Sequence, residues 1–238
     1  MSLARLRYEA RVIGPANLLI PLAVIPIYLG FSIIAGVAVL RGDGPTSFAH
    51  FQAMRGLMGL LENGLPLAGG LVAAATLGSD PLLEVHLSLP WAYRWTGALR
   101  LALSGLWVLL LTALAGSLIA ATGFWPSALI APLPRGQLIW LSPLLVFVSL
   151  GAFSAIALRS RTAASAMVGL LWVAQFLFKS LFEQSVVLQR VYLFLTEEYG
   201  VPGYWLANRL TLVAIGCALF CVTLWLLGRN ETLLGAES

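Results

Sequence analysis

Side chains that could act as catalysts or metal ligands are few in this sequence and stand far apart. The two histidines, His50 and His86, are separated by a long apolar run, and no cysteine lies near either of them. A zinc site needs Cys or His ligands at short spacings, whereas hydrolases and nucleotide-binding proteins use Gly-x-Ser-x-Gly or Gly-Lys-Ser/Thr motifs. None of these patterns occurs in the chain. We therefore expect no catalytic residue and no metal site.

The other potential nucleophiles are typical of packing residues. Cys217 and Cys221 are one helical turn apart in a single apolar run, where a disulfide between them is not expected. Ser104, Ser149 and Ser165 have no base beside them in the sequence. A serine in an apolar helix commonly donates to a backbone carbonyl of the preceding turn. The chain is therefore not expected to be an enzyme by itself.

The elements that position these residues must be apolar helices. The chain has 238 residues, of which 60% are hydrophobic and only 10% are charged. A soluble domain has roughly 25% charged residues, so this surface is suited to lipid rather than water. The net charge of +4 is spread over loops, which favours contact with anionic lipid headgroups and gives no reason to expect a nucleic acid partner.

Uncharged runs divide the chain into six expected membrane spans, since a helix needs about 20 apolar residues to cross a bilayer. We predict an all-α polytopic membrane protein with spans at about 14–40, 60–78, 99–121, 137–158, 162–182 and 207–228. No ionisable side chain is expected well inside a span. Glu62, Arg100 and Lys179 are expected to reach the lipid interface by snorkelling.

The two ends of the chain are expected on the cytoplasmic side. The very short loop at 159–161 contains Arg159 and Arg161, and cytoplasmic loops are enriched in arginine and lysine. Residues 1–13 place Leu3, Leu6 and Ala10 on one helical face, which predicts an amphipathic helix lying in the interface.

Small residues recur at four-residue spacing in two of the spans, which lets helices approach closely. They are Gly70, Ala74 and Gly78 in the second span and Thr112, Gly116 and Ala120 in the third. Two interpretations remain open, namely packing within one bundle and a dimer interface.

The segment between the second and third spans predicts a short helix across the membrane surface. Ser79 or Asp80 can cap it, and Pro81 suits its first turn. Apolar residues follow, and Pro90 ends the helix. A capped helix held between two spans is a stiff lever that could transmit motion from a cytoplasmic partner, although an ordinary capped connector has the same pattern.

Two stretches of the sequence resemble a known family. The first is Glu62…Leu65-Pro66…Asp80-Pro81-Leu82-Leu83-Glu84…Leu87-Ser88-Leu89-Pro90…Arg100, and the second is Trp205-Leu206-Ala207-Asn208-Arg209 before the last span. In this order they resemble permease subunits of type-2 ABC transporters of the exporter group. With six spans and an amphipathic N-terminus, the resemblance covers nearly the whole chain.

The resemblance implies a partner subunit that supplies the energy. Residues 79–92 would be a coupling helix seated on a separate ABC ATP-binding subunit, which would bind ATP and Mg²⁺, while this chain would bind no cofactor. The contacts would come from Asp80, Leu83, Glu84, Leu87, Ser88 and Pro90. A second permease subunit, identical or homologous, would complete a dimer.

The resemblance also makes residues 183–206 an outer re-entrant helical hairpin before the last span. Their apolar runs are too hydrophobic for a free loop and too short to cross the membrane. The position of Arg209 suggests a charge pair with Glu62 or Glu183 near the outer interface. If that pairing is direct, a charge swap should rescue a single mutant.

The function expected on these grounds is that of a multi-pass permease subunit in the cell inner membrane, exporting a hydrophobic or amphipathic substrate. Aromatic residues in the spans, such as Trp107 and Trp172, suit such a cargo. The alternatives are an ATP-independent carrier or channel and a non-transport membrane scaffold or immunity protein. The short segment between the first two spans excludes family members with large outer domains as guides.

Overall fold

The structure is a computed structural model that describes residues 13–42, 45–77, 93–121 and 135–228. Every regular element in these ranges is a helix, which confirms the all-α class there. Two short turns interrupt the α-helices, a π-helical turn (η1) and a 3-10 turn (η2). The elements are α2 (Pro15–Arg41), α3 (Thr46–Gly59), η1 (Leu60–Gly64), α4 (Leu65–Leu77), α6 (Tyr93–Ala121), η2 (Arg135–Gln137), α7 (Leu138–Leu158), α8 (Arg161–Leu177), α9 (Lys179–Gln184), α10 (Val186–Gln189), α11 (Leu195–Tyr199) and α12 (Trp205–Leu227).

Five helical stretches of the described residues are long and apolar enough to cross a membrane. They are Asn17–Arg41, Thr46–Leu77, Trp95–Ile119, Arg135–Leu158 and Trp205–Leu227. The fifth predicted span, 162–182, corresponds to α8, which has 17 residues and is therefore only about 26 Å long. The polytopic helical architecture is thus present, with five long helices and one shorter apolar helix.

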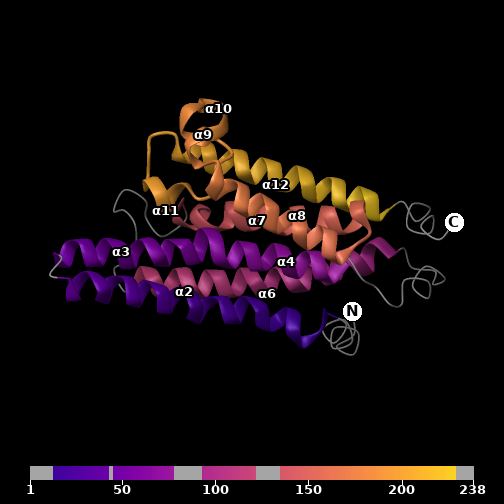
Figure 1. Cartoon of the computed structure of the whole chain (residues 1–238). Helices are drawn as coiled ribbons and strands as arrows, with labels where there is room; N and C mark the ends of the chain where they lie inside the picture. Colours follow the sequence, from indigo (N-terminus) through magenta and orange to yellow (C-terminus); the bar gives the residue numbers. More distant parts are fainter. Residues whose placement is uncertain (1–12, 43–44, 78–92, 122–134, 229–238) are drawn as a thin grey trace.

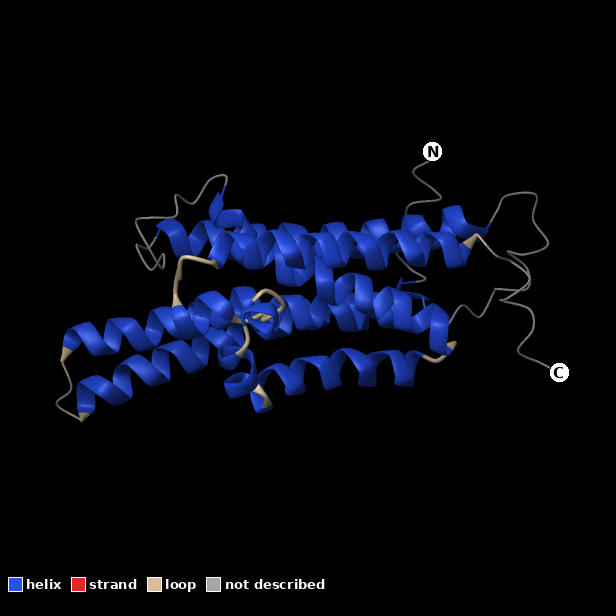
Figure 2. Cartoon of the chain, turned by 90° about the horizontal axis from the view of Figure 1, so that it is seen from above, coloured by secondary structure: helices blue, strands red, loops and turns tan. Residues whose placement is uncertain are grey.

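The second predicted span differs most from the structure. Instead of starting near residue 60, α3, η1 and α4 form one continuous helix of 32 residues. His50 and Arg55 interrupt the apolar pattern of α3 and hid it in the sequence. A helix of this length is about 48 Å long and exceeds a hydrocarbon core of about 30 Å. Consequently α3 and the adjoining end of α2 lie side by side and extend beyond the other helices (Figures 1 and 2).

Helix α7 lies at the centre of the bundle, packed against α4 and α12. The closest approach joins α4 to α7, where a Cβ added at Gly151 would overlap the backbone carbonyl of Gly70. Ala74 is fully buried beside Ala155. Both Gly70 and Ala74 therefore serve packing inside this bundle, and Gly116 likewise faces Trp140 of α7.

Large apolar side chains cover the outside of the described helices, as expected for surfaces that face lipid. Along α6, Leu106, Leu110, Leu114 and Leu118 form an exposed stripe at four-residue spacing. Most side chains of α2 are also exposed, including Phe31 and Ile34. This pattern is the reverse of a water-soluble bundle, in which such faces would be polar.

The bundle has two distinct ends. At one end Leu77 packs with Ile156 and Leu227, and Gly97 lies beside the same side chains, so α4, α6, α7 and α12 all end or begin there. At the other end the short helices α9, α10 and α11 form the return from α8 to α12 (Figure 1). The predicted interfacial helix at 1–13 lies outside the described residues except for Ile13, which is buried.

Candidate functional site

The candidate site is a buried polar cluster at the end of the bundle that holds α9 to α11. It is centred on Glu62, which lies in η1 and has no exposed surface. Single π-helical turns inside α-helices occur frequently at functional sites. The expectation that Glu62 snorkels to the interface is wrong, because protein atoms surround its side chain.

The charged partner of Glu62 is Arg209 of α12, which is also fully buried. One terminal nitrogen of Arg209 donates to the Glu62 carboxylate and, over 2.7 Å, to the hydroxyl of Thr196. The other donates to the Leu193 carbonyl at 3.2 Å. Withdrawing two charges from solvent costs several kcal/mol per ion, so a buried pair persists only when further hydrogen bonds surround it. Those bonds are present here.

Glu62 also holds the backbone of α11. Its two carboxylate oxygens accept the N–H groups of Thr196 at 3.0 Å and Glu197 at 2.8 Å. The first N–H groups of any helix lack partners within that helix. Glu62 therefore acts as an N-terminal cap supplied by another helix and joins α11 to η1 and α12 at one point.

The other two residues of the Trp-x-x-Asn-Arg match anchor the same segment. The indole N–H of Trp205 donates to the Thr196 hydroxyl at 3.0 Å. The amide of Asn208 donates to the backbone carbonyls of Gln189, at 2.9 Å, and Tyr192, at 2.8 Å. All three residues singled out at the start of the last span thus bind the chain between α8 and α12.

This chain segment is folded onto the bundle rather than free. Residues 192–195 are fully buried, and Gln175 of α8 accepts the N–H of Leu193 at 3.0 Å. Val186 and Val187 are exposed, so only part of the apolar sequence is packed. The predicted outer hairpin at 183–206 contains the end of α9 and the short helices α10 and α11.

A second charge cluster lies next to the buried pair. Glu198 is bonded by Arg55 of α3, at 2.5 Å, and by Lys179 of α9. Burial opposes ionisation of Glu198, but the bonds and charges of Lys179 and Arg55 outweigh it and lower the pKa of this carboxyl. The two cations therefore fasten α11 to α3 and α9, and Lys179 is an ion-pair partner rather than a snorkelling residue.

Glu197 lies between these two groups. The side-chain amide of Asn63 donates to its carboxylate. Burial, followed by the nearby charges of Glu62 and Glu198, raises the pKa of Glu197 to about 8, against the opposing effects of Arg55 and Asn63. The surroundings of this carboxyl therefore favour its neutral form.

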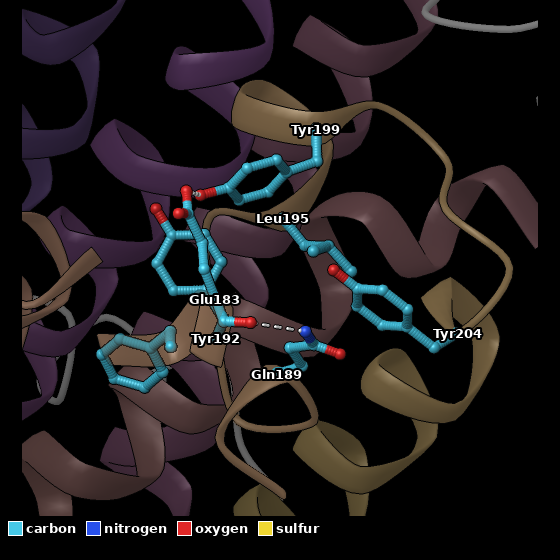
Figure 3. A pocket seen from close by; sticks show the side chains of 7 residues that line it. Glu183, Gln189, Tyr192, Leu195, Tyr199 and Tyr204 are labelled. Atoms are coloured by element: carbon cyan, nitrogen blue, oxygen red, sulfur yellow. Dashed lines mark hydrogen bonds between the residues drawn. The ribbon is translucent and has the colours of Figure 1, made fainter. Parts of the chain in front are cut away.

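Glu183, the second carboxylate proposed for Arg209, belongs to a different place. Its carboxylate accepts the hydroxyl of Tyr199, and Gln189 donates to its backbone carbonyl at 2.9 Å (Figure 3). These residues border a small, partly open pocket lined by Phe182, Glu183, Gln189, Tyr192, Leu195, Tyr199 and Tyr204. Burial and the bond to Glu183 raise the pKa of Tyr199, which keeps its hydroxyl a donor.

The expected coupling residues lie outside the described residues. These are Asp80, Leu83, Glu84, Leu87, Ser88 and Pro90. The helices that flank them, α4 and α6, end and begin at Leu77 and Tyr93. Because Leu77 and Gly97 meet Leu227, this connection leaves and rejoins the bundle at the end opposite Glu62 and Arg209.

Three ionisable side chains at or near the ends of the predicted spans are buried among protein atoms. Besides Glu62 and Arg209, Arg100 of α6 is only 1% exposed. The sequence placed Glu62 near the start of a span because α3 was taken for a loop. Within the described ranges no group of three or more His, Cys, Asp or Glu residues could hold a metal ion, and Cys217 and Cys221 are unbonded and exposed.

Asn63, Thr196 and the roles of the acidic pair at 197–198 were not predicted from the sequence. Two signals could have revealed them. Glu62-Asn63-Gly64 is a polar interruption within an apolar run, and Glu197-Glu198 follows directly on the buried residues 192–195. Charged residues in such surroundings need partners, since an unpaired buried charge is costly.

No protein-family model matches this chain, and no curated protein or solved structure is detectably similar to it.

Proposed function

We propose that this chain is the membrane-spanning permease subunit of an ATP-driven transporter of the type-2 ABC class, working as an exporter. The chain provides the path through the membrane, and a separate ABC ATP-binding subunit hydrolyses ATP. In this arrangement residues 79–92 form the helix that contacts the ATP-binding subunit.

The observation that supports the proposal best is the Glu62–Arg209 ion pair. These residues come from the two separate stretches that resemble the family, one at the second span and one at the start of the last span. Their bonds also fix α11, so both stretches serve a single structural purpose. A chance resemblance gives no reason for the two stretches to meet in space.

The two ends of the bundle suit the two sides of a membrane. We assign the end with Leu77, Leu227 and the Arg159–Arg161 turn to the cytoplasm, following the positive-inside rule. Both termini are then cytoplasmic, in the inner membrane. The segment 178–204 is then the outer element and dips back between α8 and α12. Helix α8, extended by α9, then forms the sixth membrane crossing.

The exposed apolar faces suit a hydrophobic or amphipathic substrate and a second permease subunit. The substrate would pass between two copies or homologues, since α4 and α7 are packed too closely at Gly70 and Gly151 to leave a path within one bundle. ATP and Mg²⁺ would bind only to the partner ATPase.

Purification of the chain from its native membrane tests the proposal. An ABC ATP-binding subunit should co-purify, and its ATPase activity should depend on this chain. Glu84→Ala and Leu87→Ala should lose this dependence, whereas Glu183→Gln, an exposed carboxylate at the opposite end, should retain it. If the ATPase activity still depended fully on this chain in both Glu84→Ala and Leu87→Ala, residues 79–92 would not form the contact with the ATP-binding subunit.

A second candidate, an ATP-independent carrier, is favoured by one observation. Ionisable residues buried among membrane helices often mark ion or proton pathways, and Glu62, Arg100 and Arg209 are buried. This candidate predicts substrate flux in liposomes that contain only this chain. Flux that requires the ATP-binding subunit and ATP selects the permease instead.

A further inference from the structure

The carboxylates of Glu62, Glu197 and Glu198 lie close together around α11, and only two of the three are ion-paired. Glu62 is paired with Arg209, and Glu198 is paired with Arg55 and Lys179. Among the described residues none forms an ion pair with Glu197. The third carboxylate is therefore placed beside two like charges without a cation of its own.

The immediate surroundings of Glu197 favour a neutral carboxyl. Asn63 of η1 is its hydrogen-bond partner, and a Cβ added at Gly59 would lie 3.0 Å from its Oε1 atom and 3.2 Å from the Tyr28 ring. An asparagine amide offers both a donor and an acceptor. It can therefore bond the carboxylate through its NH₂ group or, when turned over, accept the proton of the carboxylic acid.

Unsatisfied polar atoms gather around the same residues. The Oδ1 atoms of Asn63 and Asn208, the Nε of Arg209 and the hydroxyl of Tyr192 are all buried and have no hydrogen-bond partner among the residues that the structure describes. Buried polar atoms are nearly always bonded in folded proteins. The Asn63 Oδ1 in particular is an unsatisfied hydrogen-bond acceptor next to the Glu197 carboxyl.

Charged or titratable groups on the surrounding elements act on Glu197. They are Tyr28 on α2, Arg55 on α3, Glu62 in η1, Tyr192 before α11, and Glu198 on α11 itself. Lys179 of α9 pairs with Glu198, and Arg209 of α12 pairs with Glu62. Burial raises the pKa values of Tyr192 and Tyr199, so both stay protonated, and Glu198 stays ionised. Glu197 is thus the group in this cluster placed to exchange a proton near neutral pH.

We propose that Glu197 is a proton-binding site whose occupancy sets how firmly α11 is held against η1 and α3. With the proton bound, the neutral carboxyl donates to the Asn63 Oδ1 and α11 stays docked on Glu62. When the proton leaves to water, a third negative charge remains beside Glu62 and Glu198, and the docked position is weakened. This goes beyond the proposed permease function, because it concerns the segment between α8 and α12 and needs neither ATP nor substrate.

The direction of the pH effect follows from the raised pKa. A carboxyl with a pKa of about 8 when docked and an ordinary value when undocked favours docking fully at acidic pH. Between the undocked and the docked pKa, docking weakens as the pH rises, and the equilibrium constant for opening increases by up to about tenfold per pH unit. Above the docked pKa this constant no longer changes. An ion pair such as that of Glu198 would give the opposite slope.

Hydrogen exchange of the full chain in lipid nanodiscs tests the proposal. The reporters are the amides of Thr196 and Glu197, which donate to Glu62. After correction for intrinsic exchange, their opening should increase with pH up to about pH 8 in the wild type. Glu197→Gln should be protected at all pH values without the slope, and the matched control Glu183→Gln should keep the wild-type slope.

Two outcomes would overturn the proposal, namely wild-type protection that does not change with pH, or a slope that persists in Glu197→Gln. Should Glu197→Gln not fold, infrared titration of the wild type gives a second answer. A protonated carboxyl signal must disappear on raising the pH through the same window, and its absence at neutral pH contradicts the proposal. Loss of ATPase coupling alone would not affect either result.

Discussion

Glu62 and Arg209 form an ion pair with no exposure to solvent, although they are 147 residues apart in the chain. Their partners have a fixed polarity. Glu62 accepts two backbone N–H groups from α11, while Arg209 donates to the Leu193 carbonyl and the Thr196 hydroxyl. The pair therefore joins three elements, and its orientation is set mainly by backbone groups, which mutation cannot exchange.

Removal of either charge should strongly destabilise the chain. Glu62→Gln or Arg209→Gln leaves the other charge buried without a partner, which costs about 3–5 kcal/mol. Thermal unfolding in detergent should show a large fall in the midpoint for both variants. The double variant should lose less than the sum of the two. Additive losses would contradict direct coupling.

A charge swap should not rescue the single variants, contrary to the expectation from sequence. An arginine at position 62 would face the N–H groups of Thr196 and Glu197, and a glutamate at position 209 would face the Leu193 carbonyl. Expression and unfolding midpoints of Glu62→Arg/Arg209→Glu should be no better than those of either single variant. Recovery toward wild type would show that the surrounding backbone groups contribute little.

Thr196 should be more sensitive than an ordinary threonine. Its hydroxyl accepts hydrogen bonds from Arg209 and Trp205, so Thr196→Val leaves two buried donors unsatisfied. An unsatisfied buried group costs about 1–3 kcal/mol, whereas Thr196→Ser keeps the acceptor and should be close to wild type. Equal unfolding midpoints for the valine and serine variants would show that the hydroxyl is not needed.

The contact between α4 and α7 should tolerate no side chain at Gly151. A Cβ there would overlap the Gly70 carbonyl and force two backbones apart, whereas a Cβ at Gly169 of α8 meets no atom within 4 Å. Overpacking of a core costs about 1–3 kcal/mol, so Gly151→Ala should lower the unfolding midpoint. Gly169→Ala should maintain or raise it, because alanine favours a helix by about 1 kcal/mol.

Through its ion pairs with Arg55 and Lys179, Glu198 clamps α11 to α3 and α9, and this clamp should weaken in acid. Its folded-state pKa is lowered by Lys179 and Arg55, so its contribution is present above the pKa of an unfolded carboxyl and is lost as the pH falls below that value. Below that value, limited proteolysis of the segment between α8 and α12 should therefore increase, whereas the effect of Glu197 on docking operates above it. Glu198→Gln should be cleaved readily at all pH values, and an unchanged rate in this variant would exclude the clamp.

The sequence predicted most of the helices but not the interior of the bundle. Long uncharged runs gave α2, α7 and α12 nearly to the residue, because lipid exposure demands continuous apolar sequence. The sequence did not predict α3, because His50 and Arg55 interrupt its apolar pattern as loop residues would. The length of α3 is set by packing against α2, which no local pattern encodes.

The candidate site was predicted only in part. The sequence named Arg209 with Glu62 or Glu183, and the structure brings it to Glu62. It could not foresee that the same carboxylate caps α11, since this requires the three-dimensional path of residues 178–204. Nor could it foresee the state of Glu197, which depends on the neighbouring charges of Glu62 and Glu198.

The proposal that this chain is an ABC permease is tested most directly by crosslinking from its two ends. A photoreactive amino acid replaces Glu84 in one variant and Tyr199, at the opposite end, in another. After irradiation of native membranes, position 84 should become joined to an ABC ATP-binding subunit identified by mass spectrometry, and position 199 should not. An intact, functional chain that yields no such crosslink at position 84, or equal crosslinking at both positions, would contradict the proposal.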